Sequence, residues 1–124
     1  MIKYYEAFRS LAESGLKIGD KVMVKYKESK YFMKYGRITY IKNSGKIQGD
    51  CTVKFDYDGI IESFYYTNLL KVIEIIEVPT GEVFNIDYED ASELDMTGII
   101  RYNPNTKYYY FDEQDRWQID QFIL

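Results

Sequence analysis

The side chains that most often perform catalysis are scarce in this chain of 124 residues. It contains no histidine and one cysteine, so neither a Ser–His nor a Cys–His relay can be assembled, and the commonest general base near neutral pH is missing. Cys51 alternates with Val53 and Phe55, which predicts a buried, inert thiol on the inward side of a strand. Carboxylates are plentiful, but no spacing singles out an acid/base pair. We therefore expect a protein that is not an enzyme and that uses no cofactor.

Carboxylates gather most densely in one short segment. Its acidic residues are Asp87, Glu89, Asp90, Glu93 and Asp95. A calcium loop of the EF-hand type needs an oxygen ligand at its fifth position and glycine at its sixth, and counting from Asp87 these positions hold Ala91 and Ser92. We therefore predict no metal here. Two interpretations stay open: an ordinary solvated acidic loop, or a loop that contacts a partner.

The first part of the chain carries the opposite charge. Residues 1–78 hold 13 Lys and Arg against 10 Asp and Glu, whereas residues 79–124 hold 3 against 10. One basic stretch is interleaved with aromatic residues, and its cations are Lys21, Lys25, Lys27, Lys30, Lys34, Arg37, Lys42 and Lys46. Cations that meet phosphates beside rings that stack on bases are the ingredients of nucleic-acid binding. The solvent face of a half-buried sheet has the same composition, and the overall pI of about 4.9 argues against nucleic acid.

The spacing of apolar residues predicts the elements that position these groups. Residues 2–14 repeat apolar side chains at helical spacing until Gly15, which predicts an N-terminal amphipathic helix. Alternation predicts strands at 21–27, 35–41 and 51–55, and a turn at Asp58-Gly59 leads into a fourth strand. Residues 67–70 suit a single 3₁₀ turn, and residues 72–78 suit a fifth strand.

The sequence also resembles itself when it is shifted by 62 positions. The aligned pairs include Gly19 with Gly81, Tyr26 with Tyr88, Gly36 with Gly98 and Tyr40 with Tyr102. This predicts a shortened second copy over residues 81–124, with tight turns at 103–106 and 113–116 and a closing 3₁₀ segment near 119–123. In that copy the acidic segment is the loop between the first two strands. The alternative is a chance likeness between two β-sequences.

The first copy resembles Tudor-type domains, which belong to the SH3-like barrel group. The resemblance is carried by a glycine-led first strand at 19–22, an aromatic at Tyr35 before the second strand, the acidic-Gly turn that closes 53–59, and Asn68-Leu69-Leu70. It implies a mainly β fold of two SH3-like (Tudor-like) small barrels in tandem, closely coupled. The barrels would span residues 17–78 and 79–124, after the N-terminal helix at 1–16.

Tudor-type domains often bind methylated lysine or arginine in an aromatic cage, where ring faces attract a cation. By position, the resemblance implies a cage of Tyr26, Tyr35 and Tyr57, with Asp58 as the acidic helper. The chain departs from the family in having no tryptophan in the first copy. Packing in the core or at the barrel rim is the alternative role for these rings. In SH3-like folds the loop that would hold the acidic segment often contacts partners.

We expect a soluble, cytoplasmic protein, located in the host cytoplasm if a phage encodes it, that does not associate with membranes. No apolar run approaches membrane-spanning length, and one cysteine permits no disulfide within the chain. Our leading hypothesis is a non-enzymatic protein-binding module, such as a phage-type inhibitor of a host defence factor or an immunity protein. The alternative is a protein that binds DNA or RNA through the basic, tyrosine-rich first barrel.

Overall fold

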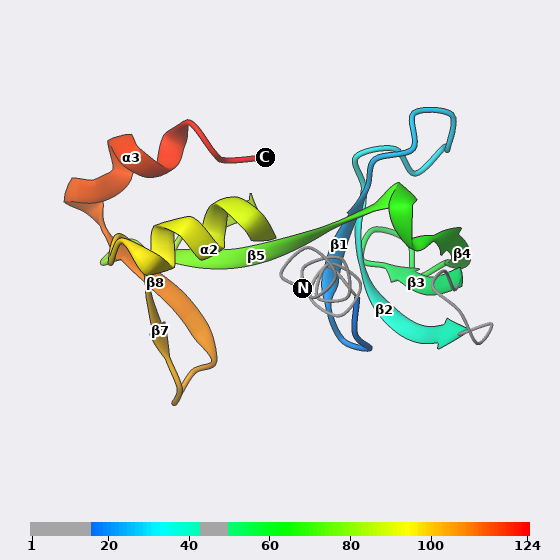
Figure 1. Ribbon diagram of the computed structural model, residues 1–124, viewed down its shortest axis with the longest axis horizontal. Coiled ribbons are helices and arrows are strands. Elements are labelled where there is room, and N and C mark those ends of the chain that lie inside the picture. The colour runs from blue at the N-terminus through cyan, green and yellow to red at the C-terminus, as the bar shows by residue number, and fades with distance from the viewer. Residues whose placement is uncertain (1–15, 43–49) are drawn as a thin grey trace, which may run out of the picture. The chain divides into compact units, whose positions relative to one another are not determined.

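The computed structural model describes residues 16–42 and 50–124. The chain divides into two compact units, residues 1–71 and residues 72–124, each with its own apolar core. The expected N-terminal helix and Lys46 of the basic stretch lie outside the described residues. The expected mainly β character is confirmed, since strands are the principal elements of both units (Figure 1).

The first unit is an antiparallel sheet. Its strands are β1 (Lys21–Val24), β2 (Tyr35–Lys42), β3 (Asp50–Phe55), β4 (Ile61–Tyr65) and the first three residues of β5 (Leu69–Val78), with a 3₁₀ turn η1 (Tyr66–Asn68) before β5. The pairing order is β4-β3-β2-β1-β5. Period-two alternation of apolar and polar residues places one side of these strands in the core. The β3–β4 hairpin turns at Gly59, which has a φ of +72°.

The core of the first unit is aromatic at its centre. The Tyr31 ring stacks on Phe55 with centroids 4.0 Å apart, and Phe64 meets Phe55 edge-on at 5.8 Å. Cys51 is buried beside them, and burial raises the pKa of its thiol. Gly36 lets β2 approach β3 closely, because a Cβ at this position would lie 2.6 Å from Val53 Cγ1.

The second unit contains the remainder of β5, followed by β6 (Val83–Asp87), α2 (Tyr88–Met96), β7 (Arg101–Asn103), β8 (Tyr108–Asp112), the 3₁₀ turn η2 (Glu113–Asp115) and α3 (Arg116–Asp120) (Figure 1). β5 pairs antiparallel with β6 and parallel with β8, and β8 pairs antiparallel with β7. Its core is formed by residues of β5, β6, α2, β8 and α3 and by Ile100 just before β7. The buried residues are Ile75, Phe84, Ile86, Ala91, Leu94, Ile100, Phe111 and Ile119.

The expectation of two tandem barrels is wrong. In the first unit, no pairing between described residues joins the outer strands β4 and β5. In the second, the order β6-β5-β8-β7 is also open and includes a parallel pair. The repeat would require β6 to pair with β7. Instead β6 pairs with β5, to which a tight turn joins it: the Gly81 N–H donates to the Glu77 carbonyl and the Glu77 N–H donates to the Glu82 carbonyl. The strands therefore form an open sheet.

Two segments of the supposed second copy are helices. The acidic segment, expected as a loop, forms α2, because Asp87 caps its first turn and Ala91 and Leu94, three residues apart, are buried on one side. The expected turn at 113–116 and the segment after it form η2 and α3, which bury Ile119. The turn predicted at 103–106 is confirmed, since it joins the paired strands β7 and β8.

Candidate functional site

The three tyrosines proposed for an aromatic cage lie on different parts of the first unit. Tyr57 is 78% exposed, with Lys34 Nζ 5.0 Å from its ring centroid. Tyr35 is half-buried on β2, and Lys21 Nζ lies 5.0 Å from its ring. The rings that would receive a methylated cation thus already face lysines of the same chain. No ring contact among the described residues joins two of the cage tyrosines.

The other two members of the proposed cage have local partners. The Tyr26 hydroxyl donates to Glu28 Oε2 at 2.8 Å, and this hydrogen bond raises the pKa of the phenol. Asp58 accepts from the Tyr31 hydroxyl at 3.1 Å and from the Ile60 N–H at 3.0 Å. Its carboxylate therefore anchors the buried Tyr31 to the β3–β4 turn.

The basic stretch separates into two groups. Lys25, Lys27, Lys30 and Lys34 are exposed on the segment between β1 and β2. Lys21, Arg37 and Lys42 lie on the strands, and the register places Lys54, which sequence reasoning did not include, directly opposite Arg37. The structure thus describes a loop group and a sheet group of cations.

The acidic residues all belong to α2 or its cap. The Asp87 side chain accepts from the Glu89 N–H at 3.1 Å, as an N-cap residue does. Glu89 lies in the first turn, where the helix dipole favours negative charge, but Asp95 lies near the C-terminal end, where it does not. None of the acidic residues of this helix pairs with a basic side chain in the described parts of the chain.

A cavity of about 210 Å³ lies between α2 and the segment that contains α3. Its polar lining comes from Asp90 and Glu93 on one side and from Gln118 and Gln121 on the other, and Leu94 and Phe122 are among its apolar residues. Burial, together with Asp87 and Glu93, raises the pKa of Asp90. Carboxylates pushed together in this way, beside two amides, form a site that attracts a cation with a long apolar stem.

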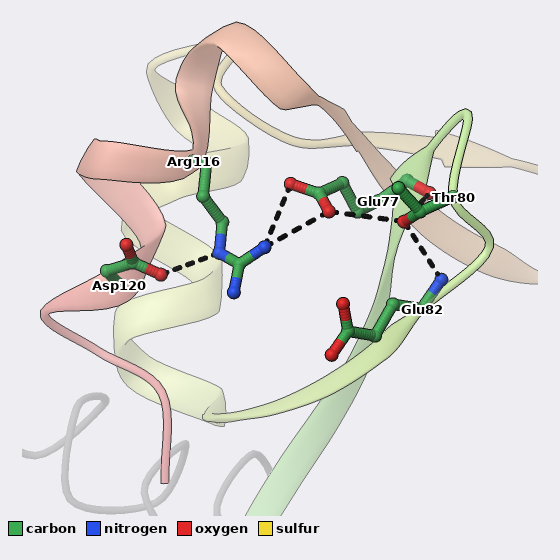
Figure 2. Close-up of polar contacts among 5 residues, drawn as sticks. All are labelled: Glu77, Thr80, Glu82, Arg116 and Asp120. Atoms are coloured by element: carbon green, nitrogen blue, oxygen red, sulfur yellow. Dashed lines mark hydrogen bonds and ion pairs between the residues drawn. The ribbon is translucent and has the colours of Figure 1, made fainter.

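An ion-pair network fixes the position of α3. Arg116 Nη1 donates to both carboxylate oxygens of Glu77, at 3.1 and 3.2 Å, while its Nε donates to Asp120 Oδ1 at 2.7 Å (Figure 2). Glu77 also accepts from the Thr80 hydroxyl at 3.1 Å. The guanidinium lies 4.5 Å from the Phe84 ring centroid. Because these bonds join α3 to the end of β5, where Glu77 also bonds Thr80 of the following turn, they hold the glutamine side of the cavity in place.

The exposed Trp117 was missed by sequence reasoning. It is the only tryptophan of the chain and is 72% exposed on α3, next to the cavity residue Gln118. Met96, at the end of α2, is 87% exposed and precedes the cavity residue Thr97. The available signal is a lone tryptophan in a polar segment, which the internal repeat predicts to be a turn followed by a 3₁₀ segment.

The described residues offer little for other chemistries. They contain no group of three or more His, Cys, Asp and Glu side chains that could hold a metal ion. No helix within them has both the length and the apolar character needed to cross a bilayer. Comparison with known proteins finds no matching family model, no similar curated protein and no similar solved structure.

Proposed function

We propose that this chain is a non-enzymatic protein-binding module and that its second unit binds a basic protein. The observation that carries this proposal is the cavity beside α2. Asp90 and Glu93 converge on it, and neither carboxylate has a cationic partner among the described residues. A lysine or arginine of a partner would supply the missing positive charge.

The size of the cavity favours a side chain over a cofactor. Pockets for drug-sized ligands measure roughly 300–1,000 Å³, and this one is smaller, at about 210 Å³. A lysine or arginine stem would pack against Leu94 and Phe122, and its charged end would meet the two carboxylates. The neighbouring glutamines would accept or donate the remaining hydrogen bonds.

The surroundings of the cavity suit a protein interface. Exposed tryptophan is enriched among the residues that dominate protein–protein binding energy, and exposed methionine is common on adaptable binding surfaces. Trp117 and Met96 supply one of each. A small inhibitor or immunity protein that covers a basic groove on its target would use such a surface, and this is the biological setting we propose.

We also propose that the first unit is related to the SH3-like group. Support comes from five strands in the expected order, with a 3₁₀ turn between the fourth and fifth. An SH3-like unit is a frequent carrier of binding surfaces, although its fold alone does not identify a ligand.

The test is a matched pair of double variants on the same helix. Asp90→Asn with Glu93→Gln neutralises the cavity, whereas Glu89→Gln with Asp95→Asn removes the same charge from residues that do not line it. Each immobilised protein is exposed to host lysate at moderate salt, and retained proteins are identified by mass spectrometry. We expect the wild type and the control to retain one basic protein that the cavity variant loses. Equal losses from both variants would mean that α2 acts only through its total charge, and the proposal would fail.

A further inference from the structure

The sheet of the first unit has a solvent-facing side made of β2, β3 and β4. Residues directly opposite each other on paired strands share a face. Cys51, Val53 and Phe55 face the core, so Thr52 and Lys54 face solvent. The residues that pair with Thr52 and Lys54 on the neighbouring strands β2 and β4 lie on this same side of the sheet. We call this side the outer face.

Cations lie in a line across the outer face. Lys21 on β1 is opposite Arg37 on β2, which is opposite Lys54 on β3. Arg37 Nη1 donates to the Gly19 carbonyl oxygen at 3.3 Å, and Lys21 Nζ lies 5.0 Å from the Tyr35 ring centroid, so these like charges, which would otherwise disfavour a sheet, have other groups beside them. Lys42 lies farther along β2 on the same face. It is opposite Asp50, which is the one acidic residue among these paired outer-face residues of β2, β3 and β4.

Aromatic rings lie beside these cations. Tyr40 is opposite Thr52 and is 58% exposed, and Tyr65 is opposite Asp50 and is 60% exposed. The two tyrosines are on β2 and β4, so β3 separates their backbones by roughly 10 Å across the sheet. Between them, the Thr52 and Ser63 hydroxyls lie 3.2 Å apart and present donors and acceptors to solvent.

We propose that the outer face binds single-stranded nucleic acid. Bases would stack on Tyr40 and Tyr65, and phosphates would contact Arg37, Lys54 and Lys42. Exposed rings next to cations match the two requirements of this ligand, since stacking needs unpaired bases and the backbone needs positive charge. An acidic peptide would use the cations but would gain little from the rings. The inference does not depend on the acidic cavity, which belongs to the other unit.

Fluorescence anisotropy with labelled oligo-dT and oligo-rU of about 12 nucleotides tests the stacking. Because one base–aromatic stack contributes about 1–3 kcal/mol, Tyr40→Ala and Tyr65→Ala should each weaken binding by about 5-fold to 150-fold. Tyr40→Phe keeps the ring and should bind like the wild type. Tyr57→Ala is the matched control, since Tyr57 is exposed but belongs to the β3–β4 turn. The difference between the two oligonucleotides assigns DNA or RNA.

A salt titration tests the phosphate contacts. Each phosphate neutralised on a single strand contributes about −0.7 to the slope of log K against log salt. Lys54→Gln should therefore make the slope shallower by about 0.7, whereas Lys27→Gln, on the loop between β1 and β2, should not.

Any of these results would overturn the inference: no binding at low salt, equal effects of Lys27→Gln and Lys54→Gln, or unchanged affinity in the tyrosine-to-alanine variants. Tighter binding of duplex than of single strands would also overturn it. Thermal unfolding of each variant shows whether the fold is intact. Failure here would leave the cavity variants of α2 to be judged by their own assay.

Discussion

Replacing Arg116 by methionine removes the charge that faces the most deeply buried carboxylate described in the structure. The side chain of Glu77 is 5% exposed and that of Arg116 is 37% exposed. Methionine keeps an apolar stem beside Phe84 but leaves Glu77 with only the Thr80 hydroxyl among the side chains that bond it. The carboxylate would then be buried without a compensating charge.

The cost follows from these burial values. Breaking a fully buried ion pair by removing one partner costs roughly 3–5 kcal/mol. Because Arg116 is more than a third exposed and Thr80 still donates to Glu77, we expect a loss of about 2–3 kcal/mol in the free energy of unfolding. For a small domain this corresponds to a decrease in Tm on the order of 10 °C.

Urea unfolding followed by circular dichroism measures the loss, and the same unit provides a matched control. Arg101 pairs with Asp112 at 3.0 Å, but these side chains are 67% and 44% exposed. Arg101→Met should therefore cost about 1 kcal/mol or less. Adding Glu77→Gln to Arg116→Met should restore part of the stability, because it removes the unpaired charge. If Arg116→Met loses no more than Arg101→Met, the Glu77–Arg116 pair does not fix α3 as we argue.

Three further perturbations follow from the structure. The pKa of Asp90 is raised in the folded protein, so its ionised form opposes folding. Asp90→Asn should therefore stabilise the protein at neutral pH. This gain should vanish as the pH falls below the usual aspartate pKa of about 3.9. Urea unfolding across this pH range checks the sign, and a destabilising effect at neutral pH would contradict it. Gly36→Ala should lower stability by about 1–3 kcal/mol, because its Cβ would lie 2.7 Å from the Lys54 carbonyl oxygen; unchanged stability would contradict the close approach of β2 and β3. Tyr31→Phe should cost about 1 kcal/mol in chemical denaturation through loss of its bond to Asp58, with the ring stack retained; no loss would mean that this bond is not formed in solution.

Local patterns predicted the first unit well. Alternation at Cys51, Val53 and Phe55 identified the buried side of β3, and the Asp58-Gly59 pair identified its hairpin. Both signals concern neighbours in sequence, so tertiary context has little opportunity to override them. The facing of Lys54 and Arg37 was not predictable in the same way, because their register depends on an irregularity in β2 between Ile38 and Tyr40.

The second unit shows why aligned residues did not imply aligned structure. Gly19 and Gly81 both have positive φ, of 95° and 76°, as a shared turn requires. Gly36 and Gly98 were also aligned, yet Gly36 permits a close strand contact, whereas a Cβ at Gly98 would meet nothing and the residue instead has a φ of +79°. Identical residues thus meet different requirements. The helix cap at Asp87 was the local signal that could have revealed α2.

Each of the two proposed surfaces places charges of one sign close together. Arg37 and Lys54 oppose each other across the sheet, and burial, together with Asp87 and Glu93, raises the pKa of Asp90 at the cavity. Optimising surface charge is a common route to stabilised variants, and its recurrent cost is lost function. The presence of these charges in separate units, with opposite signs, is what two ligands of opposite charge would require. Neutralising either surface should therefore preserve or raise stability while it abolishes the binding of one ligand and leaves the other unaffected.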